Sequence, residues 1–330
     1  MLGEVNRFNL AILIDLNYLG IRSGFRFQEF SVIKPEGQIK TGSLFGVLQF
    51  LELISTNYPF AQIIICNDGA PTERKKLFEG YKASRVATAE KPIDPNISAW
   101  RNLKPELFRM IGGIQNLVVL QHPEKEADDL IAKLAFLNLQ AGKDVVVFTS
   151  DKDMMQLMAF GANMSKEISE GELVLLTEDY VLNHEKLGVE PKYIPYLRPW
   201  SGDPSDDIPP AVLRVPRAVK AEVAKGWYDS GKHELTEALM ESILDNITSV
   251  NVTKGTRQKF IDGIPQANLN FKLMDLTRYE KEPIEGVKVV PTEYSKDTVL
   301  YYGLKKYLSW REGNALSFQS VDELLSSALS

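Results

Sequence analysis

The sequence predicts an α/β fold with a mostly parallel sheet flanked by helices, followed by a smaller helical part. The main observation is a set of apolar runs of strand length: 10–15 (LAILID), 62–67 (QIIICN), 116–121 (NLVVLQ) and 144–149 (DVVVFT). Such runs are typical of strands that are buried on both faces. The last two are separated by a helix-length amphipathic segment, which predicts a strand, helix, strand unit with parallel strands and a right-handed crossover.

Further elements follow from spacing and caps. The first crossover helix is expected over 41–56, where apolar side chains recur at helical intervals. The run 172–177 (ELVLLT) predicts another strand, and Thr177 is a suitable N-cap for the next helix. Near the end, 297–311 predicts a packed amphipathic helix, and Ser320 with Glu323 offers a capping box for a last one.

Aspartates follow three of the predicted strands. Asp15, Asp68 and Asp151 stand at or just after strand ends, so parallel strands would bring them to one edge of the sheet, where α/β proteins bind ligands. Acids also open two predicted helices, at 126–129 (EADD) and 150–153 (SDKD). The alternative is that these acids only cap helices, and Ser150 with Asp153 fits a capping box.

Convergence of these carboxylates would be costly without a counter-charge. Two like charges about 4 Å apart repel by ~1 kcal/mol in water and by ~4 kcal/mol at the effective dielectric of a protein surface. The predicted cluster must therefore take up protons or bind cations.

Basic and aromatic residues alternate in the segment 72–86. If this segment is a helix, one face carries a set suited to phosphate pairing and base stacking: Arg74, Lys75, Phe78, Tyr81, Lys82 and Arg85. The alternative is a solvated helix in which Glu79 pairs with Lys75 and Lys82. The loop 87–96 contains two prolines and separates this helix from a second one, so 72–105 could form an excursion above the acidic edge.

The stretch 200–210 (WSGDPSDDIPP) marks a change in character. Its glycine, prolines and aspartates predict a turn, and turn chemistry alone could explain Asp203 and Asp206. The sequence beyond it is mostly helical and begins with the basic residues Arg214, Arg217 and Lys220. We therefore expect an α/β core over 1–200 and a smaller helical domain over 201–330.

Composition limits the class of protein. The opening residues lack the order of a signal peptide and no apolar run reaches membrane-spanning length, so a cytoplasmic protein without membrane contact is expected. One cysteine and three scattered histidines argue against disulfides and a zinc site. The net charge of -6 argues against nucleic acid, but without the nine acids assigned below 38 basic residues face 35 acidic ones.

In their order, these motifs resemble the 5′→3′ exonuclease and flap endonuclease family, in particular its stand-alone bacteriophage members. The matching pieces are ILIDLNYLGIRS, CNDGAPTERKKLFEGYKASR, EADDLIAKLA, TSDKDMMQL and SGDPSDDIP. The resemblance implies a PIN-like core, a helical arch over about 72–105 and a helix-hairpin motif in the C-terminal domain.

The resemblance also implies residue roles. It places metal-binding carboxylates at Asp15, Asp68, Glu126, Asp128, Asp129, Asp151, Asp153, Asp203 and Asp206. It makes Lys82 and Arg85 arch residues that contact the scissile phosphate and, with Asp151 and Asp153, the candidate catalytic residues. DNA contacts are expected from the cationic and aromatic face of 72–86 and from Arg214, Arg217 and Lys220.

The helix-hairpin motif departs from the family pattern. The run 209–217 (PPAVLRVPR) has no glycine, and Asp207 stands where the family commonly has asparagine, which argues against a potassium ion there.

The expected activity is hydrolysis of DNA at 5′ ends and 5′ flaps during replication, extending to RNA primers in RNA–DNA hybrids. An all-oxygen ligand set favours Mg²⁺, with Mn²⁺ as a substitute, and two ions would suit phosphodiester hydrolysis. We expect a monomer, with replication proteins as partners. The rivals are an RNA-directed nuclease of the wider PIN group and a DNA-junction binding protein without catalysis.

Overall fold

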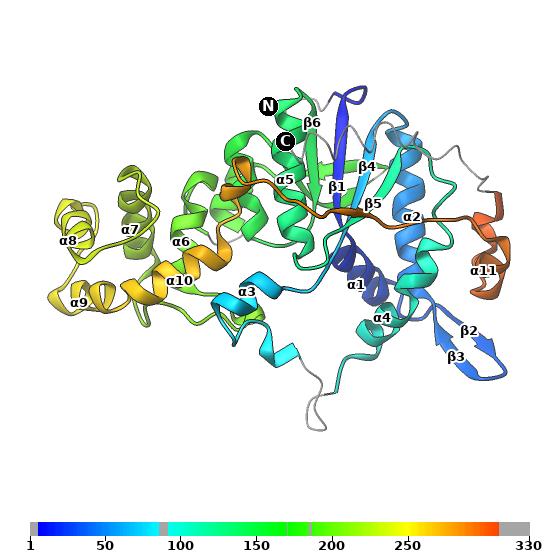
Figure 1. The fold of residues 1–330 in the computed structure, drawn as a ribbon, viewed down its shortest axis with the longest axis horizontal. Coiled ribbons are helices and arrows are strands. Elements are labelled where there is room, and N and C mark those ends of the chain that lie inside the picture. The colour runs from blue at the N-terminus through cyan, green and yellow to red at the C-terminus, as the bar shows by residue number, and fades with distance from the viewer. Residues whose placement is uncertain (1–5, 86–91, 170, 185–186, 310–330) are drawn as a thin grey trace.

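A computed structural model of the chain describes residues 6–85, 92–169, 171–184 and 187–309. It has an α/β core and, to one side, a group of helices (Figure 1). The core and its mostly parallel sheet confirm the predicted fold class. None of the helices in these ranges is both long and apolar enough to cross a bilayer.

The main sheet has seven strands in the order β8-β7-β6-β1-β4-β5-β9. Five of them are parallel: β1 (Leu10–Asp15), β4 (Gln62–Asn67), β5 (Leu117–Gln121), β6 (Asp144–Phe148) and β7 (Asn163–Ser169). The edge strands β8 (Glu172–Leu175) and β9 (Lys288–Val289) are antiparallel. The four predicted strands of the sheet centre are confirmed, and so is the strand at 172, whereas β7 was not predicted.

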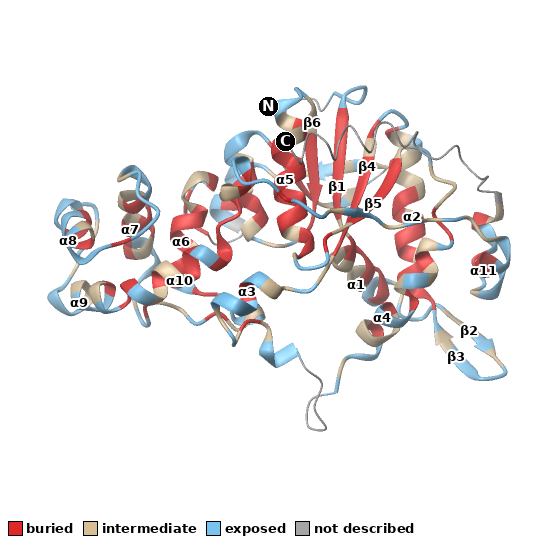
Figure 2. Ribbon diagram, in the orientation of Figure 1, coloured by how far each residue is buried: buried red, intermediate tan, exposed pale blue. Residues whose placement is uncertain are grey.

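Helices cover both faces of this sheet, because its strands alternate apolar side chains between two cores. Leu10, Ile12 and Ile14 point to one core, and Ala11 and Leu13 to the other. The first core is covered by α1 (Leu16–Arg26), α2 (Gly42–Asn57), α4 (Pro95–Phe108) and α11 (Lys296–Tyr301). The second is covered by α5 (Ala127–Gln140) and a 3₁₀ segment, Asp153–Phe160. Figure 2 shows that the central strands are buried and that α2 and α5 are themselves largely buried where they pack on them.

The remaining helices form the lateral group with a third apolar core. They are α6 (Ile194–Ser201), α7 (Arg217–Asp229), α8 (Glu237–Asn246), α9 (Lys254–Asp262) and α10 (Ile264–Met274). We expected 201–330 to be a helical domain, but the chain returns to the α/β core after α10. Ile284 packs in the second core, β9 pairs with β5, and Val299 packs in the first core.

The arch segment differs most from expectation. Helix α3 covers only Thr72–Leu77, and a short 3₁₀ turn follows at Ala83–Arg85. Phe78 is extended, with φ -146° and ψ 105°, and Lys82 has a φ of 55°, so no continuous helical face exists over 72–85. Residues 86–91, which include the first half of the predicted loop 87–96, lie outside the described ranges.

Three smaller expectations have different outcomes. The alternative capping box of Ser150 and Asp153 is not formed, because the 3₁₀ segment there has no side-chain cap, whereas Glu126 and Asp129 form a capping box at the start of α5. The predicted helix at 297–311 breaks after α11 at Gly303, whose φ is 72°. The last predicted helix lies outside the described ranges.

A small hairpin of β2 (Ser31–Lys34) and β3 (Gly37–Lys40) projects beside α4 and α11 (Figure 1).

Candidate active site at the carboxyl edge of the sheet

A cavity of about 830 Å³ lies at the carboxyl ends of the parallel strands. Seven of the nine predicted carboxylates line it: Asp15, Asp68, Glu126, Asp128, Asp151, Asp203 and Asp206. The adjacent parallel strands β6, β1 and β4 bring three of these together, because they end at the same edge. The convergence predicted from strand ends is therefore observed.

Hydrogen bonds hold the three strand-end aspartates. Asp15 caps α1 by accepting the Tyr18 N–H at 2.9 Å. Thr149 lies between two of them, since its hydroxyl donates to Asp15 at 3.3 Å and accepts the Asp151 N–H at 3.2 Å. Asp68 accepts the Ala127 N–H at the start of α5, at 2.7 Å. These bonds attach the carboxylates to rigid elements.

Crowding raises the proton affinity of the cluster. Burial and the charge of Asp68 raise the pKa of Asp15 to about 7. Burial, followed by repulsion from Asp151, raises the pKa of Asp128 well above its usual range, and burial also raises the pKa of Asp151. Among the described residues, the lysine and arginine ion pairs at this site are formed by Glu126, Asp153, Asp203 and Asp206 rather than by these three carboxylates. A bound cation would therefore relieve both the burial cost and the mutual repulsion.

Asp129 does not line the cavity. It is 2% exposed and accepts two hydrogen bonds from Arg74, both at 2.7 Å. Burial raises its pKa, but Arg74 outweighs burial and the net shift is downward. Arg74 itself is 6% exposed and also binds Glu126 and the carbonyl of Leu273 in α10. We therefore no longer expect Asp129 to bind metal or Arg74 to contact DNA.

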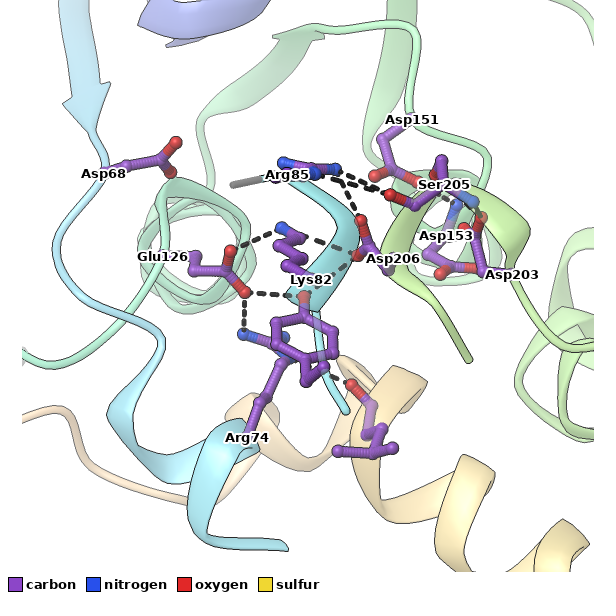
Figure 3. Close-up of polar contacts among 12 residues, drawn as sticks. Asp68, Arg74, Lys82, Arg85, Glu126, Asp151, Asp153, Asp203, Ser205 and Asp206 are labelled. Atoms are coloured by element: carbon purple, nitrogen blue, oxygen red, sulfur yellow. Dashed lines mark hydrogen bonds and ion pairs between the residues drawn. The ribbon is translucent and has the colours of Figure 1, made fainter. Parts of the chain in front are cut away.

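Lys82 and Arg85 lie over the cavity, as Figure 3 shows. The Lys82 ammonium forms ion pairs with Glu126 and, at 3.5 Å, with Asp206. The backbone N–H of Lys82 donates to the backbone carbonyl of Asp206 at 2.9 Å. These contacts hold Lys82 in a left-handed conformation that costs free energy for a residue with a Cβ. Arg85 donates to Asp206 at 2.6 Å and is otherwise exposed.

Tyr81 has a different role from the predicted base stacking. It is 3% exposed, and its hydroxyl lies 2.7 Å from Glu126 and 2.9 Å from Asp206. Phe78 is half-buried, whereas Lys75 is exposed on α3. Of the six residues predicted on one helical face, only Lys75, Lys82 and Arg85 remain available to a nucleic acid.

Arg198 in α6 was missed by the sequence analysis. It donates to Asp153 at 2.6 Å and to Asp203 at 2.7 Å. Asp153 lies outside the cavity lining, and burial raises its pKa to about 7 despite Arg198. A lone arginine between two acidic motifs has no distinctive pattern, so only the tertiary structure identifies this pair.

The Asp203–Asp207 turn is attached to the arch segment. Asp203 caps the turn by accepting the Ser205 N–H at 2.8 Å. Asp207 has a φ of 58° and accepts the Ser84 N–H at 2.8 Å. The aspartate that departs from the family pattern therefore helps to fix the segment that carries Lys82 and Arg85.

The predicted C-terminal cations lie around the turn that follows α6. Arg214 and Arg217 are exposed, and Lys220 is half-buried near the carbonyl of Trp200, at 3.4 Å. Arg214 has a φ of 53°, so the run without glycine still contains a left-handed residue. The exposed positions of Arg214 and Arg217 make their guanidinium groups accessible to a phosphate.

A metal ion would need the carboxylates to move. Within the described ranges, no three His, Cys, Asp or Glu side chains lie close enough together to hold one ion. Several carboxylates are instead paired with Lys82, Arg85 and Arg198. The donor set itself consists of oxygens, which suits hard divalent cations.

Comparisons with known proteins identify related sequences. A family model described as 5'-3' exonuclease, N-terminal resolvase-like domain, matches residues 10–186. The chain is 32% identical over 202 residues to a 5'-3' exonuclease of Buchnera aphidicola, covering 60% of this chain and 64% of that protein. It is 27% identical over 294 residues to DNA polymerase I of Mycobacterium leprae, covering 88% of this chain and 28% of that protein.

The fold is similar to solved structures. The T5 D15 protein co-crystallised with metal ions has a TM-score of 0.60 and 14% identity, over 97% of this chain and 99% of the other. A complex of the bacteriophage T5 D15 flap endonuclease with DNA and metal ions also has a TM-score of 0.60, with 15% identity, over 96% and 99% of the two chains. At these identities the similarity concerns the fold alone.

Proposed function

Because the chain belongs to the 5'-3' exonuclease family, we propose that it is a structure-specific, metal-dependent 5′ nuclease that hydrolyses DNA phosphodiesters at 5′ ends and 5′ flaps. One observation carries this proposal. Carboxylates from β1, β4, α5 and the segment after β6 converge in one cavity, and Lys82 and Arg85 lie over it. Such a site can hold cations below a phosphate and cationic side chains above it.

The residues fit two divalent ions. Asp15, Asp68, Asp128 and Asp151 are crowded and form no ion pair with a lysine or arginine of the described residues, so after a shift of their side chains they would hold one ion, most simply Mg²⁺ or Mn²⁺. Glu126, Asp203 and Asp206 would contribute to the second once their ion pairs open. The ions would supply an activated water and stabilise the leaving oxygen. We do not include Asp153, which the resemblance placed among the metal-binding carboxylates, because it pairs with Arg198 outside the cavity lining.

Lys82 and Arg85 would act on the phosphate. In the structure their charges are balanced by Glu126 and Asp206, which are proposed metal ligands. When a divalent ion neutralises those carboxylates, both cations become free to face a phosphodiester. Charge placed where negative charge develops in the transition state is usually the largest contribution to catalysis.

The substrate assignment rests on the shape of the site and on relatives. Lys82 and Arg85 line the cavity together with Trp100, Arg101 and Lys104 of α4, and such a mixed cationic and aromatic lining suits a single strand that ends in a 5′ terminus. The T5 flap endonuclease was solved with DNA and metal ions, which supports DNA as the substrate here. Removal of RNA primers during Okazaki-fragment processing is part of this proposal.

The test is cleavage of end-labelled 5′-flap, nicked and RNA-primed duplexes with Mg²⁺, with Mn²⁺ and with EDTA. We expect cleavage near the flap junction with either ion and none with EDTA. Binding of flap DNA without any cleavage would favour a junction-binding protein, and cleavage of single-stranded RNA alone would favour an RNA-directed nuclease of the PIN group. Either result would reject the proposal.

A further inference from the structure

Asn17 connects a predicted metal ligand, Asp68, to α4, the second helix of the predicted arch. It lies in the first turn of α1, and its Nδ2 donates to Asp68 Oδ2 at 2.6 Å. Its Oδ1 accepts the Nε1–H of Trp100 in α4 at 3.0 Å and lies 3.5 Å from the Lys104 ammonium. The amide orientation is chemically unambiguous, because a carboxylate needs a donor and an indole N–H needs an acceptor.

Asp68 is held from two sides. Asn17 binds Oδ2, and the Ala127 N–H donates to Oδ1 at 2.7 Å. These two bonds fix the plane of the carboxylate in the cavity. A carboxylate accepts about four hydrogen bonds, so each oxygen keeps a lone pair for a cation.

A second chain of amides reaches the backbone of Asp68. Lys104 donates to Asn67 at 2.9 Å, Asn67 donates to Gln121 at 3.1 Å, and Gln121 donates to the Asp68 carbonyl at 2.9 Å. Lys104 lines the same cavity as the carboxylates. Both chains therefore start on α4 and end at Asp68.

The position of α4 against α1 is tightly defined. Trp100 is 1% exposed, and a Cβ placed on Gly20 would lie only 2.1 Å from its ring. The ring thus fills the space that the glycine leaves, and α4 cannot shift along α1 without moving the Trp100 N–H away from Asn17.

We propose that Asn17 is a positioning residue that orients Asp68 for a divalent cation and ties this orientation to α4. The inference rests on the metal dependence proposed above. Mutation of a residue that hydrogen-bonds a metal ligand typically lowers the metal affinity by about 10–100-fold. Asn17 should therefore act on the metal rather than on DNA affinity.

The test uses three variants of the full chain. Asn17→Leu keeps the size of the side chain but removes its donor and acceptor, and Trp100→Phe removes only the indole N–H partner while keeping an aromatic ring. The control is Asn9→Leu, which changes an exposed amide at the opposite end of β1, where Nδ2 donates to the Gly142 carbonyl. Thermal unfolding checks that each variant is folded.

Two measurements decide the outcome. Calorimetric titration with Mn²⁺ in the absence of DNA should show a dissociation constant about 10-fold higher or more for Asn17→Leu, a smaller increase for Trp100→Phe and no change for Asn9→Leu. The Mg²⁺ concentration that gives half-maximal single-turnover cleavage should rise in the same order, and cleavage should recover at high Mg²⁺. Flap affinity measured in Ca²⁺ should not change.

Other results would overturn the inference. One is an Mn²⁺ affinity that is unchanged in both Asn17→Leu and Trp100→Phe. The other is a loss of cleavage that high Mg²⁺ does not restore. If Asn17→Leu does not fold, the Mn²⁺ affinity of Trp100→Phe decides. A wild-type protein that binds no Mn²⁺ and cuts equally well in EDTA would instead reject the proposed function, so the two failures are distinguishable.

Discussion

At the scale of the residue, the acidic side chains fall into two classes that their identity does not distinguish. Asp15, Asp128 and Asp151 lie in the cavity without a cation and have raised pKa values. Asp129 and Asp153 are instead neutralised by Arg74 and Arg198. An arginine beside a buried carboxylate stabilises its charged form, whereas crowding among carboxylates favours uptake of a proton or of a cation.

Asp151→Asn tests the first class. The amide cannot supply the charge that a divalent ion requires, so we expect cleavage of a 5′ flap to fall by about 10³-fold or more, equivalent to about 4 kcal/mol of transition-state stabilisation. Flap binding should remain measurable by fluorescence anisotropy. Asp144→Asn, at the other end of β6, is the matched control and should cut normally. Normal turnover of Asp151→Asn would remove this residue from the metal site.

Lys82→Ala tests the proposed contact with the scissile phosphate. Loss of a charge that acts in the transition state should slow single-turnover cleavage by about 10²–10³-fold while changing flap affinity little. Lys75→Ala, an exposed lysine on the neighbouring α3, should reduce affinity slightly without slowing the chemical step. If Lys82→Ala lost only affinity, Lys82 would be a tether for DNA rather than a catalytic residue.

At the scale of the element, tertiary contacts override helical pattern in the arch segment. The residues of 72–85 are compatible with one amphipathic helix, yet α3 ends at Leu77. Beyond it, the Lys82 N–H donates to the Asp206 carbonyl and Tyr81 reaches the carboxylates of the cavity. These contacts cannot form from a continuous helix, because a helix would direct the same N–H to its own preceding turn.

The contact between α1 and α4 is an element-scale feature that can be tested by stability. Gly20→Ala would place a Cβ 2.1 Å from the Trp100 ring, so overpacking should lower the free energy of unfolding by about 1–3 kcal/mol or more. Gly255→Ala, in α9, meets nothing within 4 Å and should be neutral or stabilising by up to about 1 kcal/mol. Urea unfolding measures both. Equal stability of the two variants would mean that α4 can move away from α1.

At the scale of the whole molecule, the net charge of -6 hides a separation of charge. Carboxylates gather inside the cavity, whereas Lys75, Arg85, Arg214 and Arg217 are exposed near it or after the adjoining turn. Metal ions would cancel the acidic part when DNA binds. Long-range attraction of a nucleic acid then depends on the exposed cations.

Arg214→Asn tests this reading, since asparagine removes the charge but tolerates the left-handed backbone at φ 53°. If Arg214 pairs with a phosphate of the duplex, the variant should weaken flap binding regardless of sequence and reduce the salt dependence, d log K/d log[salt], by about 1. Lys143→Asn, just before β6 at the amino ends of the parallel strands, should change neither the flap affinity nor its salt dependence. An unchanged salt slope for Arg214→Asn would exclude this contact.

Much of the core was predictable because strand burial is a local signal. Fully apolar runs identified β1, β4, β5 and β6, and the aspartates after them met at one edge because parallel strands end together. The strand β7, with its polar alternation NMSKEIS, and the return of 284–309 to the core gave weaker patterns. Their places depend on neighbours that are distant in sequence.

The amino-acid sequence by itself determined the α/β class, the sheet edge at which acids gather, and the cationic segment above it, because periodicity and strand ends are properties of short stretches. Tertiary structure alone decided which acids face the cavity, where α3 ends, and which side chains hydrogen-bond the proposed metal ligands. Arg74, Arg198 and Asn17 find their partners 45 or more residues away or across a turn, and those distances are set only when the elements pack.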